Sequence, residues 1–284
     1  MRIVYKGYNL ILEKNEPQNF FGITDFAMRN FDKDILKMRK NVQEKMEAKL
    51  EFPLDSDSNI DAQKIMNDWF PNYKADIFIS HSHKDEKTAK RLAIWLKEKL
   101  GLTVFIDSIV WGSADDLLKK IDDEYSVLSR KGSQVAYNYG IRNYTTSHVH
   151  MMLMAALTEV INNTECLFFL NTPNSVSVRE VQNKKTNSPW IYAELKMAGV
   201  IEKKLPKRIQ IEINKELQRS ETFNSKDKLP KFDYLLNNDL NKLKILKKHD
   251  LVMWSELIAR SSNEDLNKMH PLDLLYGEER KKDL

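Results

Sequence analysis

The residues best suited to chemistry in this chain are a tryptophan and a glutamate four positions apart, Trp190 and Glu194. The preceding Ser188-Pro189 is typical of a helix start, with serine as the cap and proline in the first turn. Residues four apart share one helix face, so the indole and the carboxylate can touch. A fixed carboxylate can stabilise the positive charge that develops on a sugar when its glycosidic bond breaks. We therefore interpret Glu194 as a candidate catalytic residue and Trp190 as a wall of its pocket.

A plainer interpretation of the same pair is structural. A lone Trp-x-x-x-Glu spacing is common by chance, so Trp190 could be a core aromatic and Glu194 a surface residue of the helix. The elements that precede this helix decide between the two interpretations, because a catalytic helix must face the end of a sheet at which other polar residues gather.

Three short apolar runs predict the strands of a parallel sheet, at 75–80, 102–107 and 166–170. Between the first two, apolar residues recur at helical spacing until Gly101, which is typical of a helix stop. Strand, helix and strand of these lengths form a βαβ unit with parallel pairing. The third run is apolar throughout, as in a strand covered on both faces, so Cys166 is a packing residue. We predict an α/β fold with a doubly wound, flavodoxin-like parallel sheet.

Polar residues follow each predicted strand. Ser80 and Ser82 follow the first strand, Asp107 and Trp111 follow the second, and the helix with the Trp-Glu pair follows the third. In doubly wound sheets, ligands bind beyond the carboxyl ends of the strands. We therefore predict that Ser80, Ser82, Asp107 and Trp111 bind substrate together with the Trp-Glu pair. The indole of Trp111 has an equally good interpretation as a core residue.

The domain organisation follows from breaks in these patterns. We expect residues 1–71 to form an N-terminal accessory segment, extended over 1–14 and helical over 33–50. The α/β domain then covers 72–205. Residues 206–284 form a mostly helical extension that could complete the sheet.

Irregular chain is expected in three places. Residues 111–113 are predicted to form a hinged lid after the second strand, followed by a helix over 115–128. Residues 130–144 form a Gly-, Tyr- and Asn-rich insertion, after which Thr146 or Ser147 caps a helix. Residues 277–284 form a frayed, charged tail. In the C-terminal extension, we expect a short strand near 209–211, a turn at 229–234, and a helix through Leu240, Leu243 and Leu246 that leads to Leu251 and a final strand.

Composition excludes several classes of protein. The 284 residues are 42% hydrophobic and 30% charged with a net charge of +4, and both signs are interspersed, so we expect no nucleic-acid partner. No apolar run approaches the roughly 20 residues that cross a bilayer, so we expect no membrane partner. The single cysteine, Cys166, excludes an internal disulfide and favours a cytoplasmic location. Because no Gly-x-Gly occurs, the Rossmann and Walker A phosphate loops are absent.

Two His-x-His pairs, His81/His83 and His148/His150, raise the question of a metal site. At a strand end both rings of such a pair share one side, as metal ligands must. The second pair opens a predicted helix, where residues two apart point in different directions. We expect no metal here, and assign these histidines to hydrogen bonds and helix caps.

Three motifs in order resemble a bacterial TIR (Toll/interleukin receptor) domain. They are Asp-Ile-Phe-Ile-Ser-His-Ser-His-Lys-Asp at 76–85, Val-Phe-Ile-Asp at 104–107 and Ser-Pro-Trp-Ile-Tyr-Ala-Glu-Leu at 188–195, and the likeness covers about 74–200. The resemblance implies that Glu194 is the glutamate that cleaves the nicotinamide-ribose bond of NAD+. It also implies a loop at 108–115 that shapes the pocket and makes assembly contacts. NAD+ is then the substrate, and no cofactor is needed. The insertion, the front segment and the long C-terminal part depart from simpler members of the family.

The NAD-consuming TIR proteins of Thoeris-type antiphage defence are the most similar group. That resemblance implies an ADP-ribose-derived signalling nucleotide as product, a downstream effector that senses it, and self-association through the TIR loops. Two other classes stay open: a TIR scaffold that acts only by association, and an enzyme similar to nucleoside deoxyribosyltransferases. A phosphoacceptor receiver domain would need acidic residues at the first strand end, where this sequence has Ser80-His81-Ser82.

Overall fold

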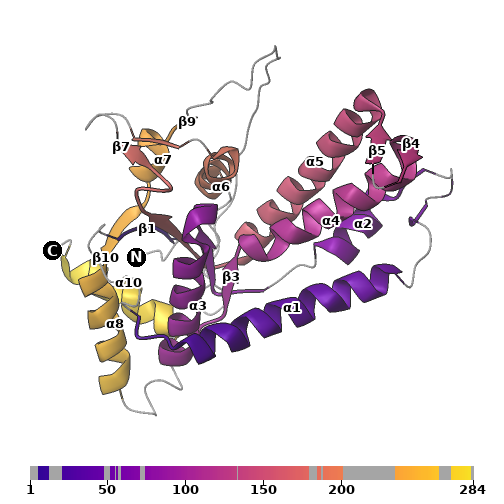
Figure 1. The fold of residues 1–284 in the computed structure, drawn as a ribbon. Helices are drawn as coiled ribbons and strands as arrows, with labels where there is room; N and C mark the ends of the chain where they lie inside the picture. The colour runs from indigo at the N-terminus through magenta and orange to yellow at the C-terminus, as the bar shows by residue number, and fades with distance from the viewer. Residues whose placement is uncertain are drawn as a thin grey trace. The chain divides into compact units, whose positions relative to one another are not determined.

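The chain forms an α/β fold around a five-stranded parallel sheet (Figure 1). The strand order is β10 (Lys244–Lys247), β1 (Lys6–Ile11), β6 (Cys166–Asn171), β2 (Ile77–Ser80) and β3 (Val104–Ile106). The structure is a computed structural model that describes residues 6–12, 21–47, 52–54, 56, 59–70, 74–132, 134–178, 184–186, 188–200, 234–261 and 270–282. The predicted α/β class with a parallel sheet is confirmed.

The order of the strands is consistent with a flavodoxin-like arrangement in one half of the sheet. Among the three predicted strands, β3, β2 and β6 have the order 2-1-3 that flavodoxin-like sheets show. The other half is built from β1, in the N-terminal segment, and β10, in the C-terminal extension. Both flanking segments therefore contribute a strand to the sheet.

The chain divides into two compact units. One is built from both ends of the sequence, residues 1–14 and 169–284, and we call it the terminal unit. The other is residues 15–168, which we call the middle unit. The predicted boundaries at 71/72 and 205/206 lie outside the described residues, so they stay predictions. The two units are described separately below.

The middle unit contains the predicted βαβ element. Strands β2 and β3 are parallel, with Ile79 opposite Ile106. Helix α3 (Glu86–Leu100) joins them after a short 3₁₀ turn, η1 (His83–Asp85), and its apolar face is buried. Gly101 ends the helix with a φ of 67°, a left-handed conformation that glycine adopts without a steric cost. The carboxylate of Asp76 accepts hydrogen bonds from the Thr103 amide and hydroxyl, both at 2.7 Å.

The front of the middle unit is helical. Helix α1 (Asp25–Glu47) covers residues 33–47 of the predicted 33–50 stripe but begins earlier, and α2 (Ala62–Trp69) follows it. Residues 48–50 lie outside the described residues. Two contacts join the front segment to α3. The Phe21 and Trp95 rings lie 6.0 Å apart, and Lys90 forms an ion pair with Asp32 at 2.7 Å.

The chain after β3 differs from the prediction. Helix α4 (Ser108–Tyr125) begins at once, so the lid predicted at 111–113 and the loop that the resemblance implies at 108–115 are wrong. The helix predicted over 115–128 is confirmed as far as Tyr125. The predicted insertion at 130–144 is a hairpin of β4 (Val127–Lys131) and β5 (Gln134–Tyr137) followed by the first turns of α5 (Tyr139–Asn163). The cap of α5 is Asn138, whose side chain accepts from the Ile141 amide at 3.1 Å, so capping by Thr146 or Ser147 is also wrong.

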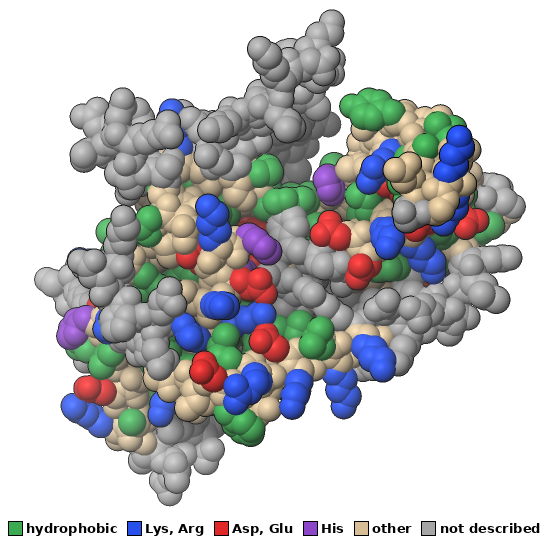
Figure 2. Space-filling view, in the orientation of Figure 1, with side chains coloured by type: hydrophobic (Ala, Val, Ile, Leu, Met, Phe, Trp, Pro, Cys, Tyr) green, Lys and Arg blue, Asp and Glu red, His purple; other side chains and the backbone are tan. Residues whose placement is uncertain are grey.

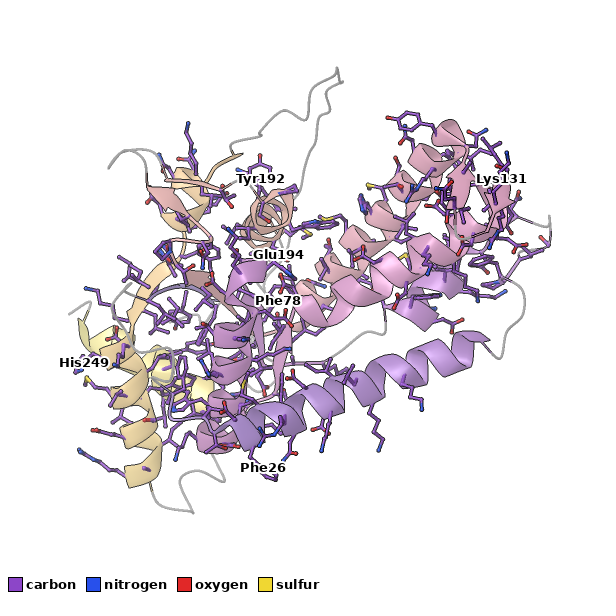
Figure 3. The ribbon with its side chains drawn as sticks, in the orientation of Figure 1. Phe26, Phe78, Lys131, Tyr192, Glu194 and His249 are labelled. Carbon is purple, nitrogen blue, oxygen red and sulfur yellow. The ribbon has the colours of Figure 1, made fainter. Side chains whose placement is uncertain are left out.

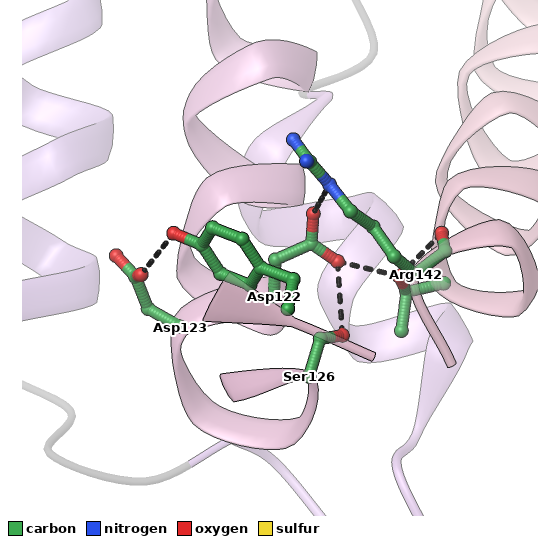
Figure 4. Close-up of polar contacts among 6 residues, drawn as sticks. Asp122, Asp123, Ser126 and Arg142 are labelled. Atoms are coloured by element: carbon green, nitrogen blue, oxygen red, sulfur yellow. Dashed lines mark hydrogen bonds and ion pairs between the residues drawn. The ribbon is translucent and has the colours of Figure 1, made fainter. Parts of the chain in front are cut away.

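A buried carboxylate holds this hairpin against the two helices that flank it (Figure 4). Asp122 of α4 is 2% exposed and accepts hydrogen bonds from Ser126 at 3.2 Å and Thr145 at 2.6 Å. Arg142 of α5 donates to the same carboxylate at 2.9 Å and lies over the Tyr137 ring of β5. The start of α5 is therefore fixed to the end of α4.

The terminal unit holds the remaining elements. A second sheet contains β7 (Ser177–Val178), β8 (Lys184–Thr186) and β9 (Tyr234–Leu235), and the helices are α6 (Pro189–Val200), α7 (Asn237–Leu240), α8 (Lys248–Arg260) and α10 (Pro271–Lys282). The single helix predicted through Leu246 is wrong, because that residue lies in β10. Leu251 lies in α8, and the predicted frayed tail belongs to α10 as far as Lys282.

Two further predictions about the C-terminal extension lie partly or wholly outside the described residues. The predicted strand at 209–211 lies outside them, as does most of the turn at 229–234. None of the helices in the described parts of the chain is long and apolar enough to span a membrane. On the face shown in Figure 2, acidic and basic side chains are interspersed.

Candidate functional site

The helix that carries the Trp-Glu pair starts as the sequence predicts. Pro189 is the first residue of α6, and the Ser188 hydroxyl accepts a hydrogen bond from the Ile191 amide at 3.3 Å. The Ser188 amide in turn donates to the hydroxyl of Thr186 in β8 at 3.2 Å. These bonds fix the first turn of α6 to the small second sheet of the terminal unit.

Glu194 occupies a core position of α6. The buried face of the helix consists of Ile191, Glu194, Leu195 and Ala198, spaced as an apolar row should be. Glu194 is 0% exposed, and in Figure 3 it lies on the opposite side of the helix from Tyr192. The interpretation of Glu194 as a surface residue is therefore wrong.

Trp190 lies one turn before Glu194, as expected from the spacing. It is partly exposed, whereas Glu194 is fully buried. The helix face that these residues share therefore runs from the surface at the first turn to the interior at the second. An indole at the start of such a face is suited to contact a flat ligand, and a carboxylate behind it is suited to contact a cation.

The helix is held in place at its outer side by an ion pair within the terminal unit. Lys196 of α6 lies 3.0 Å from the carboxylate of Asp239 in α7, which is 2% exposed. The ammonium of Lys196 also lies 5.3 Å from the centre of the Tyr192 ring. Packing of α6 against α7 therefore fixes the helix that carries Glu194.

The carboxyl ends of β1 and β6 carry a polar cluster that the sequence analysis missed. The side-chain amide of Asn171 donates to the side-chain oxygen of Asn9 at 2.9 Å, and the backbone amide of Leu12 donates to the backbone carbonyl of Asn171 at 3.2 Å. Ser175 turns back and donates to the Leu170 carbonyl at 2.9 Å. The sequence offered one signal, the polar Asn171 directly after an apolar strand. Its partner Asn9 could not be inferred, because the two residues are far apart in the sequence.

In the middle unit, the carboxyl ends of β2 and β3 meet as the parallel pairing predicts. His81 follows β2 and Asp107 follows β3, and their Nδ1 and Oδ1 atoms lie 2.7 Å apart. The two side chains are 1% and 5% exposed. Burial is the largest single influence and lowers the pKa of His81. The Asp107 carboxylate, the backbone of Ile79 and the charge of Glu86 together outweigh it, so the pKa is raised above its ordinary value.

The serines predicted to bind substrate lie at the same end of β2. Ser80 is 0% exposed at the last position of the strand. Ser82 is partly exposed, and its carbonyl accepts from the Asp85 amide at 2.7 Å in the turn that leads to α3. Trp111 lies in α4, and its side chain lies outside the described residues. Binding of substrate by Ser80, Ser82, Asp107 and Trp111 stays a prediction.

The predicted site residues thus form two groups, one in each unit. Trp190 and Glu194 belong to the terminal unit, and the residues at the ends of β2 and β3 belong to the middle unit. Sequence analysis placed His81 at a strand end, but it did not identify Asp107 as its ion-pair partner. The aspartate at the end of the neighbouring strand was the signal that could have identified it.

The described residues contain no group of three or more His, Cys, Asp and Glu side chains that could hold a metal ion. His81 forms a pair with Asp107, and His83 lies in the turn that follows. His148 and His150 are exposed and lie in the third turn of α5, where the ring of His148 lies 4.3 Å from that of Tyr144. The two His-x-His pairs therefore have different surroundings.

The fold places this chain in the class of α/β proteins with a five-stranded parallel sheet. Its candidate site contains a buried glutamate, Glu194 on helix α6. No family model matches the chain, and no curated protein or solved structure matches it. The similarity to TIR domains therefore depends on the three sequence motifs.

Proposed function

We propose that this chain is a TIR-like enzyme that cleaves the nicotinamide-ribose bond of NAD+ and that Glu194 is its catalytic carboxylate. The observation that supports the proposal most is the complete burial of Glu194 on the apolar face of α6. An ionised carboxylate loses several kcal/mol of solvation on burial, even when it is hydrogen-bonded. A leucine at position 194 would make the free energy of folding more favourable than a glutamate does, so a glutamate here is better explained by a function than by stability.

The chemistry needs one negative charge and little else. The bond from ribose C1′ to the ring nitrogen breaks with both electrons leaving on nitrogen, which turns the cationic pyridinium into neutral nicotinamide. Positive charge develops on the ribose in the transition state. The carboxylate of Glu194 attracts this charge, so it stabilises the transition state more than the ground state. Water then adds to C1′ and releases a proton, giving ADP-ribose. A different nucleophile gives a cyclic or conjugated derivative.

Trp190 supplies the apolar part of this site. Its indole offers a flat, electron-rich surface for the pyridinium, and this attraction disappears when the neutral ring has formed. Because Glu194 is closed to solvent in this structure, NAD+ reaches it only after side chains around α6 move. This requirement fits an enzyme that is inactive until it assembles or receives a signal. In the proposed role, its ADP-ribose-derived product activates an effector protein in antiphage defence.

Release of nicotinamide from NAD+ tests the proposal. We expect Glu194→Gln, which keeps the size of the side chain and removes its charge, to lower the rate by about 100- to 1000-fold. Asp122→Asn is the matched control, because it neutralises another buried carboxylate, one that bonds to Ser126, Thr145 and Arg142 and has no part in holding α6. We expect it to retain most of the activity. Equal rates for wild type and Glu194→Gln would refute the assignment of Glu194.

The same pair of variants separates the alternative functions. If the purified protein is silent, nicotinamide and ADP-ribose derivatives are measured by mass spectrometry in phage-challenged cells. Protection by Glu194→Gln equal to that by wild type, without any such product, would favour a TIR scaffold. Transfer from nucleosides in place of NAD+ would favour an enzyme similar to nucleoside deoxyribosyltransferases.

A further inference from the structure

Helix α1 of the middle unit carries its exposed basic side chains on one face. In the described part of this helix, the exposed side chains are Asp25, Phe26, Arg29, Asn30, Lys33, Asp34, Leu36, Lys37 and Lys40. At about 100° per residue, seven of these nine lie within an arc of about 120° that is bounded by Leu36 and Asn30. We call these seven residues the α1 basic face. Asp25 and Asp34 lie outside the arc, one on each side of it.

The α1 basic face holds four positively charged residues and no negatively charged one. Arg29, Lys33, Lys37 and Lys40 follow one another at intervals of four, four and three residues, along about 17 Å of the helix. Both signs are interspersed over most of the surface in Figure 2, but basic side chains form a row along this helix. Within the described parts of the chain, no carboxylate forms an ion pair with Arg29, Lys33 or Lys37. Such a row of cations attracts an extended anionic surface.

Two large apolar side chains lie among these cations. Phe26 is 67% exposed and Leu36 is 61% exposed. The phosphate backbone of a nucleic acid would contact the cations but would leave both apolar side chains in water. A bilayer with anionic lipids provides both kinds of partner, because its headgroups attract cations and its acyl boundary accepts apolar side chains. The composition of the α1 basic face therefore favours a membrane surface.

We propose that the α1 basic face binds the surface of a bilayer that contains anionic lipids, with the axis of α1 parallel to the membrane plane. The expectation of no membrane partner rests on the lack of an apolar run long enough to cross a bilayer, and binding to the surface needs no such run. This inference does not depend on the proposed enzymatic function.

The rest of the middle unit holds α1 with the α1 basic face outward. Ile35 lies on the opposite side of the helix and is buried, and Asp32 forms an ion pair with Lys90 of α3 at 2.7 Å. At the start of α1, the Thr24 hydroxyl accepts a hydrogen bond from the Ala27 amide at 3.2 Å and so caps the first turn. The face is therefore ordered before it binds, and binding costs little conformational entropy.

The number of cations determines the expected strength of binding. Each Lys or Arg near an anionic membrane raises the partition coefficient about fivefold, so four of them raise it several hundredfold. Phe26 and Leu36 add an apolar contribution that salt does not screen. We therefore expect reversible binding that weakens, but does not disappear, as the salt concentration rises.

Cosedimentation of the full chain with lipid vesicles tests the proposal. Wild type should bind vesicles of phosphatidylcholine with about 30% phosphatidylserine more than about 100-fold more tightly than vesicles of phosphatidylcholine alone. The double variant Lys33→Glu, Lys37→Glu should lose at least about 25-fold in binding to the anionic vesicles. Phe26→Ser should lose roughly tenfold, because an apolar side chain no longer enters the bilayer. That second loss should persist at about 0.5 M salt, where charges are screened.

A matched control separates the α1 basic face from the net charge of the protein. The double variant Lys119→Glu, Lys131→Glu makes the same change in net charge at exposed lysines of α4 and β4. Figure 3 shows Lys131 at the other end of the middle unit from Phe26. This control should bind the anionic vesicles as wild type does. Circular dichroism and thermal melting confirm that each variant is folded.

Three results would each overturn the proposal. One is a wild type that does not bind the anionic vesicles, and another is a control that loses as much binding as the Lys33→Glu, Lys37→Glu variant. The third is tighter binding of wild type to a DNA duplex than to the anionic vesicles at the same salt concentration, with Phe26→Ser equal to wild type on both. That result would assign the α1 basic face to a nucleic acid.

Discussion

Replacing Asp107 by asparagine should destabilise the protein, and by more at low pH than at high pH. In the wild type, the carboxylate of Asp107 lies 2.7 Å from Nδ1 of His81, and both side chains are buried. The amide of asparagine keeps the shape of the carboxylate but carries no charge. A protonated His81 is then left buried without its counter-charge.

The size of the effect follows from the burial of the pair. Removing one partner of a buried ion pair costs about 3 to 5 kcal/mol. We use the lower value because the side-chain amide of the introduced asparagine still fills the site and is polar. For units of this size, 1 kcal/mol corresponds to roughly 2–4 °C. We therefore expect a decrease in melting temperature of about 6 to 12 °C at pH 6.

The sign of the pH dependence comes from the raised pKa of His81 in the folded protein. A raised pKa stabilises the fold fully below the ordinary value near 6.5, and this stabilisation is lost as the pH rises through the folded value. In Asp107→Asn, burial acts without the counter-charge and lowers the pKa of His81. The difference in stability between wild type and variant is therefore largest at pH 6 and smaller at pH 9.

Urea unfolding of the full chain at pH 6 and pH 9 measures this difference. Asp76→Asn is the matched control, because Asp76 also joins β2 to β3, through hydrogen bonds to Thr103. No histidine is part of that contact, so its loss of stability should be similar at both pH values. Equal losses for Asp107→Asn at pH 6 and pH 9 would show that the His81 charge does not stabilise the fold.

Two further substitutions test how local contacts hold the elements. Asp122→Ala removes the acceptor of three side chains, one at the end of α4 and two at the start of α5. It should cost about 3 kcal/mol in urea unfolding and speed amide hydrogen exchange at the start of α5; unchanged exchange would contradict the role of this network. Gly101→Ala places a side chain at a φ of 67° and should cost about 1 kcal/mol. Gly199→Ala, in helix α6 and near only the flexible end of Lys242, should have no such cost; equal melting temperatures for both glycine variants would contradict this argument.

The parts of the fold that the sequence predicted correctly are those with strong local patterns. The strands at β2, β3 and β6 are apolar runs, and α3 has a clear helical period ended by Gly101. Ser188 and Pro189 correctly marked the start of α6. In each case the residues that determine the structure are close in sequence.

The errors arose where local signals were ambiguous. Residues 108–115 contain Ser, Gly and β-branched residues, which lower the helix propensity, yet they form the first turns of α4. Gly132 lies at the turn of the β4-β5 hairpin with a φ of 58°, and its presence was interpreted as irregular chain. Asn138 caps α5 earlier than the equally good candidates Thr146 and Ser147.

The sequence predicted which residues lie at the candidate site, but it did not predict their contacts or their burial. Parallel strands bring their carboxyl ends together, so Asp107 was expected near the end of β2. The ion pair with His81 depends on side-chain direction, which spacing does not determine. The burial of Glu194 depends on the side chains that pack on α6, which a local sequence pattern does not identify. In the same way, β1 and β10 extend the sheet from the two ends of the chain, so no local pattern could pair them.

The terminal unit has a consequence for the order of events during synthesis. Tyr8 of β1 pairs with Lys244 of β10, roughly 240 residues later in the chain. At about 5 to 20 residues per second, β1 waits on the order of 10 to 50 s for this neighbour. The middle unit leaves the ribosome during that interval and can fold first. Until β10 arrives, the backbone of β1 is an open strand edge, and chains that stall before residue 244 should be prone to aggregate.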